Sequence, residues 1–133
     1  MLFTPYIYHI LETRVLDGDT IEVRVDLGFK MTFTINVRLM GVNAPETKGV
    51  EKPAGLLVKQ YVQNWFDTNK DILVHSIQLD KYADRIDGDF VVGGKTLTQA
   101  LVAANLVTTV TPDGTVTKFT PDQLNSIIKR LSK

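Results

Sequence analysis

The sequence predicts a single α+β domain that is mainly β, a five-stranded barrel of the OB type with three helices. Its 133 residues, 44% of them apolar, suit one hydrophobic core but not two, so we treat residues 1–133 as one domain. Five short segments have the composition or alternation of strands, and three others have helical spacing. Short strands need protection along their edges, and closure into a small barrel provides it.

The first three strands are expected to follow one another as a meander before residue 40. Residues 6–15 are rich in β-branched and aromatic types, and Asp17-Gly18 is a strong hairpin signal. Ile21, Val23 and Val25 then alternate with polar residues, as in a strand with one buried face. The third strand should bury every second residue, namely Met31, Phe33, Ile35, Val37 and Leu39.

A helix is expected to begin at Pro53, because proline suits the first helical position. Its apolar stripe consists of Leu57, Val58, Tyr61, Val62, Trp65 and Phe66. Strands are predicted at 71–78 and 87–92, and a short helix at 97–104. Thr120 and Gln123 form a capping box that begins the third helix.

Composition excludes several classes of protein. The chain has 15 basic and 15 acidic residues, so bulk charge does not indicate a nucleic-acid partner. The absence of cysteine excludes a disulfide framework and a thiolate metal site. No apolar run is long enough to span a membrane, and no signal peptide is visible. We therefore expect a cytoplasmic protein of bacterial or viral origin, a monomer without a membrane partner.

Asp19 is the first candidate for a functional residue. It shares the parity of Ile21, Val23 and Val25, so its carboxylate would face the apolar side of the strand. A carboxylate in that position is costly unless a cation or hydrogen-bond donors meet it. A turn carboxylate satisfied by local donors is the alternative interpretation.

The segment that follows the third strand, residues 38–47, carries a second group of candidates. Arg38, Asn43 and Glu46 offer a guanidinium, a neutral oxygen ligand and a carboxylate, and Pro45 stiffens the chain before Glu46. Arg38 has the polar parity of its strand, opposite to that of Asp19. A bulge or strong curvature would be needed to bring the two side chains to one site. A polar loop at a strand end is the simpler interpretation.

A third charged segment, Asp80 to Arg85, reads locally as a solvated loop. It contains Lys81, Tyr82 and Arg85, and the surrounding stretch is rich in aspartate. Arg85 therefore matters only if it points at a defined site.

Taken together, these segments resemble the staphylococcal (micrococcal) nuclease family. The resemblance is carried by four motifs in the same order, covering roughly residues 8–130: Asp17-Gly-Asp-Thr-Ile, Arg38-Leu-x-Gly-Val-Asn-Ala-Pro-Glu-Thr-Lys48, Lys48-Gly-Val-Glu-Lys52 and Asp80-Lys-Tyr82 with a following arginine. It implies a Ca²⁺-dependent endonuclease, a hydrolase acting on the phosphodiester bonds of DNA and possibly RNA. In that family, water attacks phosphorus and the 5′-oxygen leaves, giving 3′-phosphate ends, and the resemblance implies the same reaction here.

The resemblance also implies a role for each matching residue. Asp19, Asn43 and the backbone carbonyl of Ala44 would be the Ca²⁺ ligands. Arg38 and Arg85 would bind phosphate, and Glu46 would orient or deprotonate the attacking water. The remaining substrate contacts would come from Lys48, Lys81 and Tyr82.

The chain departs from the family pattern at three places. Asn43 stands where the family usually has aspartate, which removes a negative charge beside the metal and should weaken Ca²⁺ binding by roughly tenfold or more. The segment before Arg85 is one residue longer. Thr108 to Thr111 occupies the stretch where family members can place tyrosines against the nucleotide.

Two hypotheses therefore follow from the sequence. The first is an active nuclease of low base specificity, since its contacts would be to phosphate and metal. The second is a noncatalytic OB-type module that binds single-stranded nucleic acid or a protein partner. The presence of Arg38, Glu46 and Arg85 favours the enzyme.

Overall fold

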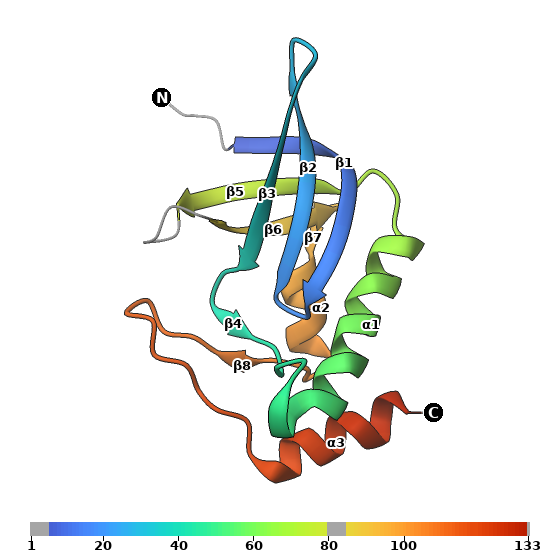
Figure 1. Cartoon of the computed structure of the whole chain (residues 1–133), viewed down its shortest axis with the longest axis vertical. Coiled ribbons are helices and arrows are strands. Elements are labelled where there is room, and N and C mark those ends of the chain that lie inside the picture. The colour runs from blue at the N-terminus through green and yellow to red at the C-terminus, as the bar shows by residue number, and fades with distance from the viewer. Residues whose placement is uncertain (1–5, 80–84, 133) are drawn as a thin grey trace.

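The computed structural model describes residues 6–79 and 85–132, which form a closed barrel flanked by three helices (Figure 1). The barrel strands follow the order β3-β2-β1-β5-β6, and a parallel pairing of β3 with β6 closes the circle. The strand bounds are β1 Tyr6–Asp17, β2 Thr20–Gly28, β3 Met31–Leu39, β5 Leu73–Leu79 and β6 Arg85–Val92. The prediction of a five-stranded barrel of the OB type is confirmed.

Shorter elements connect the barrel to the helices. They are β4 (Val42–Asn43), a 3₁₀ turn η1 (Gly49–Glu51), β7 (Lys95–Thr96) and β8 (Thr108–Thr109). The three helices are α1 (Lys52–Thr68), α2 (Leu97–Ala103) and α3 (Pro121–Leu131). Pro53 lies in the first turn of α1, as expected, and β4 pairs with β8 as a separate two-stranded sheet.

The core lies between the inner face of the barrel and α1. Ile21 and Val23 of β2 are buried as the alternation predicts, and Val58 and Val62 of α1 belong to the same buried cluster. Phe66 makes an edge-on ring contact with Phe90 of β6 at 5.0 Å between centroids. The helix α3 packs on α1, and its predicted capping box is present, with Thr120 and Gln123 exchanging hydrogen bonds.

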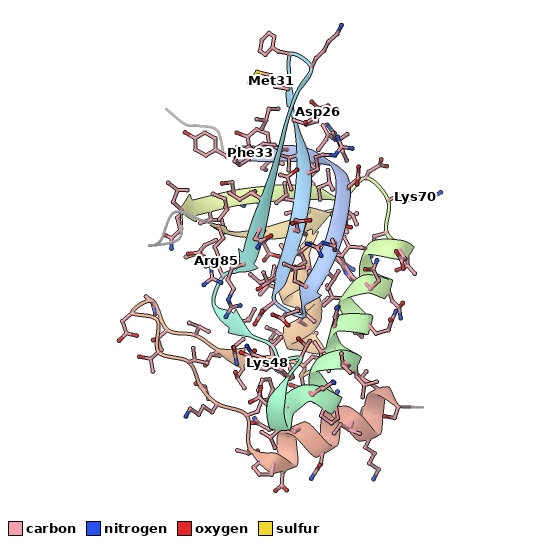
Figure 2. The ribbon with its side chains drawn as sticks, viewed as in Figure 1. Asp26, Met31, Phe33, Lys48, Lys70 and Arg85 are labelled. Carbon is pink, nitrogen blue, oxygen red and sulfur yellow. The ribbon has the colours of Figure 1, made fainter. Side chains whose placement is uncertain are left out.

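The prediction that β3 buries one whole face is wrong for its first half. Val37 and Leu39 are buried, but Met31 and Phe33 are 58% and 52% exposed. Within the described residues β6 pairs with β3 only from Asn36 onward, and the β2–β3 hairpin extends past the barrel. Figure 1 shows this hairpin projecting alone at the top, and Met31 and Phe33 lie on it in Figure 2. No helix in the described ranges is long and apolar enough to cross a membrane.

Candidate active site

The candidate site is built around the tight turn between β1 and β2. Gly18 in this turn packs so closely that an added Cβ would lie 2.6 Å from Cγ1 of Val58 and 2.8 Å from Cβ of Ala44. The next residue, Asp19, is 7% exposed. The turn is thus pressed against α1 and against the segment after β4, and this packing buries the Asp19 carboxylate.

Three donors surround the Asp19 carboxylate. Oδ2 accepts a hydrogen bond of 2.8 Å from the backbone N–H of Ala44 and lies 3.0 Å from Nη1 of Arg38. Oδ1 accepts from the hydroxyl of Thr20 at 3.1 Å. Burial raises the pKa of Asp19 above its ordinary value, although the charge of Arg38 and these hydrogen bonds act in the opposite direction. Asp19 is therefore a desolvated carboxylate held next to a cation.

Arg38 connects the end of β3 to the start of β4. Its Nη1 donates to the carbonyl oxygen of Val42 at 2.9 Å in addition to its ion pair with Asp19. The backbone N–H of Leu39 donates to the carbonyl of Asp19 at 2.8 Å, so the turn and the strand end are also joined by main chain. The Arg38 side chain is 18% exposed, which leaves it partly open to solvent.

Asp19 and Arg38 have opposite parities on neighbouring strands, yet their side chains meet without a bulge in β2 or β3 near either residue. The strand β2 begins at Thr20, directly opposite Arg38, so Asp19 lies in the turn, and it is buried in phase with Ile21 and Val23 as the alternation predicts. The irregularity lies in β1, where the register shifts between Val15 and Asp17. The predicted parity of Asp19 is therefore confirmed, and its place in the turn brings the carboxylate to Arg38.

Asn43 lies on β4 and is tied to β8. Its Nδ2 donates to the hydroxyl of Thr108 at 3.3 Å, and that hydroxyl lies 3.4 Å from the carbonyl oxygen of Asn43. Thr108 is one of the residues that the sequence analysis regarded only as a replacement for family tyrosines. In the structure it orients the candidate ligand Asn43.

Glu46 is on an exposed loop whose backbone is firmly held. Its N–H donates to the Glu51 carboxylate at 2.8 Å, and a Cβ on Gly55 would lie only 1.9 Å from its carbonyl oxygen. The neighbouring Thr47 hydroxyl donates to Asp17 at 2.7 Å. Asp17, Glu51 and Gly55 are thus positioning residues that the sequence analysis missed, because their roles depend on contacts that no local pattern reveals.

Arg85 belongs to the barrel rather than to a charged loop. It is the first residue of β6 and pairs in register with Asn36 of β3. Residues paired in register share a sheet face, so Arg85 lies on the same face as Asn36 and Arg38. Because Arg38 is two residues beyond Asn36, Arg85 and Arg38 are offset by about 7 Å along the strand direction. Figure 2 shows Arg85 beside the end of β3, where the chain turns toward β4.

The structure therefore groups some predicted residues more closely than others. Asp19, Arg38 and the Asn43–Ala44 segment meet directly, and Arg85 lies on the adjacent strand. Lys48 is exposed in the loop between β4 and α1, lower in Figure 2. The predicted substrate contacts Lys81 and Tyr82 lie outside the described residues.

The oxygen atoms at this site are of the kind that Ca²⁺ prefers, but they carry little charge. Asp19 supplies a buried carboxylate, and Asn43 Oδ1 and the Ala44 carbonyl accept no hydrogen bond from the described residues. Within those same residues, no group of three or more His, Cys, Asp or Glu side chains could hold a metal ion. The donors thus fit a weak site with one carboxylate that solvent would have to complete.

Comparison with known proteins adds no family assignment, since neither a protein-family model nor a curated protein matches this sequence. Fold and site together define a small OB-type barrel protein with a buried aspartate–arginine pair at one end of the barrel.

Proposed function

We propose that this protein is a Ca²⁺-dependent nuclease that hydrolyses phosphodiester bonds in DNA and possibly RNA, with little base specificity. The observation that carries the proposal is the convergence on the Asp19 carboxylate, which lies 3.0 Å from Arg38 Nη1 and 2.8 Å from the Ala44 N–H. Residues far apart in the sequence, from separate motifs of the nuclease resemblance, thereby meet at one buried point.

In the proposed reaction, the two arginines bind the scissile phosphate. A guanidinium can hold two phosphate oxygens at once and stays charged, so Arg38 and Arg85 would neutralise charge that develops on phosphorus oxygens. Arg38 would exchange the Asp19 carboxylate for a phosphate oxygen. Its remaining bond to the Val42 carbonyl would keep it aimed at the site during that exchange.

Glu46 would accept the proton of the attacking water, a contribution of about 10²–10⁴-fold for a well-placed general base. Its loop is suited to this role because Glu51 holds the Glu46 N–H and Asp17 holds the Thr47 hydroxyl, while the Glu46 side chain remains exposed. The water attacks phosphorus and the 5′-oxygen leaves with a proton from solvent.

Asp19, Asn43 and the Ala44 carbonyl would hold Ca²⁺, which when bound polarises a phosphoryl oxygen and offsets the charge of the in-line displacement. Binding Ca²⁺ requires the ionised form of Asp19. Ca²⁺ beside the carboxylate, in addition to Arg38, would favour the ionised form, whereas burial disfavours it. Lys48, Lys81 and Tyr82 are proposed as contacts to the flanking nucleotides.

The proposal is tested by incubating the protein with plasmid and with heat-denatured DNA, in Ca²⁺ and in excess chelator. We expect cutting in Ca²⁺ alone, and a loss of at least about 10²-fold in Glu46→Gln. Glu12→Gln is the matched control, because Glu12 forms only an exposed ion pair with Arg24 on the outer face of the barrel. Cutting that persists in chelator, or in Glu46→Gln, would refute the mechanism.

A noncatalytic OB-type binding module is the second candidate. It is favoured by the engagement of Arg38 with both Asp19 and the Val42 carbonyl, which is also how a purely structural arginine would be held. This reading predicts that oligonucleotides bind without being cut in any metal, and that Glu46→Gln leaves their affinity unchanged.

A further inference from the structure

Among the residues that the structure describes, the β2–β3 hairpin has an unpaired strand edge at the end of the barrel away from the candidate active site. Strand β3 pairs with β2 along its whole length, but on its other side the pairing with the described part of β6 begins only at Asn36, opposite Arg85. Residues 31–35 therefore have no strand partner on that side within the described residues. From Thr20 to Gly28, β2 covers roughly 27 Å, which separates this edge from the turn at Asp19.

This edge lacks the features that usually keep strand edges from pairing. It reads Met31-Thr-Phe-Thr-Ile35, with no charge and no proline, and the register shift of this hairpin lies on β2, between Asp26 and Gly28. Edge strands are normally protected by such devices, and an uncharged apolar edge is a template for another strand.

The tip of the hairpin shows a second unusual feature. Phe29 and Lys30 both have left-handed backbone conformations, with φ of 54° and 64°, and Phe29 is 96% exposed. Hairpin turns of this kind favour Asn-Gly, because other residues are strained with positive φ. The chain thus places a fully exposed aromatic ring at a strained tip, where neither local stability nor solubility would favour it.

An apolar cavity of about 140 Å³ lies where the hairpin joins the barrel. Phe33, Ile35 and Leu27 line it, together with Tyr8 and Val25. Cavity, edge and tip lie at the same end of the molecule, and together they make up a largely apolar surface.

We propose that this surface binds a second copy of the chain, with residues 31–35 of the two copies pairing as antiparallel strands about Phe33. The order of residue types in this segment is the same in both directions. Antiparallel pairing about Phe33 puts Met31 opposite Ile35, Thr32 opposite Thr34, and Phe33 opposite its own copy. Apolar pairs and threonine pairs are favourable cross-strand neighbours, so the edge is complementary to itself.

The surface area that the dimer would bury sets its expected affinity. Leu27, Phe29, Met31 and Phe33 are 38%, 96%, 58% and 52% exposed, which amounts to on the order of 500 Å² per copy. Two copies together would bury about 1,000 Å², the lower limit for a specific interface. We therefore expect a dimer with a dissociation constant in the micromolar range. This departs from the monomer that we expect from sequence alone.

The test is sedimentation equilibrium from about 1 to 500 µM. The mass of the wild type should rise from 14.9 kDa toward twice that value. Thr34→Glu should remain monomeric, because it places a charge on the edge while facing Arg24 favourably within its own hairpin. Asn125→Glu, an equally exposed change on α3, should dimerise like the wild type.

Register is tested by oxidative cross-linking, since the chain has no cysteine of its own. A mixture of Thr32→Cys and Thr34→Cys proteins should form a disulfide dimer far more readily than either alone. A monomeric wild type at 500 µM, or a dimer that Thr34→Glu leaves intact, would overturn the proposal. So would a dimer whose cross-links do not favour the mixed pair. Binding of the monomer to lipid vesicles or oligonucleotides through Phe29 would instead assign the surface to another partner.

Discussion

Gly18 allows the packing of the candidate site to be tested with a single methyl group. Its backbone is not left-handed, so the cost of Gly18→Ala comes from contact and not from φ. The added Cβ would lie 2.6 Å from Val58 Cγ1 and 2.8 Å from Ala44 Cβ, and both side chains are buried. Neither can move into solvent. We expect a loss of about 2–3 kcal/mol in the free energy of unfolding, the upper part of the range for overpacking.

A double-mutant cycle separates this explanation from a general weakening of the fold. Val58→Ala removes one side of the contact at a cost of about 1–2.5 kcal/mol. Combined with Gly18→Ala, it should lose about 1–2 kcal/mol less than the two single losses added together. Val62→Ala, buried one turn further along α1, is the control and should add to Gly18→Ala without coupling.

The assay is urea denaturation followed by the fluorescence of the single tryptophan, Trp65, which packs beside the core. Simple additivity of Gly18→Ala and Val58→Ala would refute the contact. Because Gly18 also abuts Ala44, whose N–H binds Asp19, the same methyl group should impair any activity of the site more than Val58→Ala does.

Three further outcomes are expected. The unfolding free energy should fall as pH rises from the ordinary aspartate range through the raised pKa of Asp19, because the unfolded chain releases that proton at lower pH. Urea titrations should show a steeper slope in the wild type than in Asp19→Asn, where Asp89, whose pKa burial also raises, still contributes; equal slopes would refute the role of Asp19. Asn43→Asp should lower the Ca²⁺ concentration required for half-maximal binding by about tenfold, measured by calorimetry, and an unchanged value would exclude Asn43 as a ligand. Replacing Phe29 and Lys30 by Asn and Gly should stabilise the protein by about 1–2 kcal/mol in thermal unfolding, whereas a loss would show that the turn is unstrained.

Periodic patterns predicted the elements of this fold well. The alternation of Ile21 and Val23, the helical spacing of Val58 and Val62, and the capping box at Thr120 each specify a structure within a few residues of chain. Such patterns reflect the geometry of one strand or helix, and the barrel follows because short strands need partners. The same patterns misjudged Met31 and Phe33, because alternation along one strand does not show where that strand leaves the barrel.

By itself, the sequence determined the five-stranded barrel, its helices and the identity of the candidate residues. Only the tertiary structure decided that Asp19 faces Arg38 and the Ala44 N–H, which is 25 residues away in the chain. It also decided that Asp17 and Glu51 hold the loop of Glu46, and that Arg85 lies in a strand. The physical reason is that side-chain direction in turns and loops is set by contacts between distant segments, and hydrophobic periodicity carries no information about those contacts.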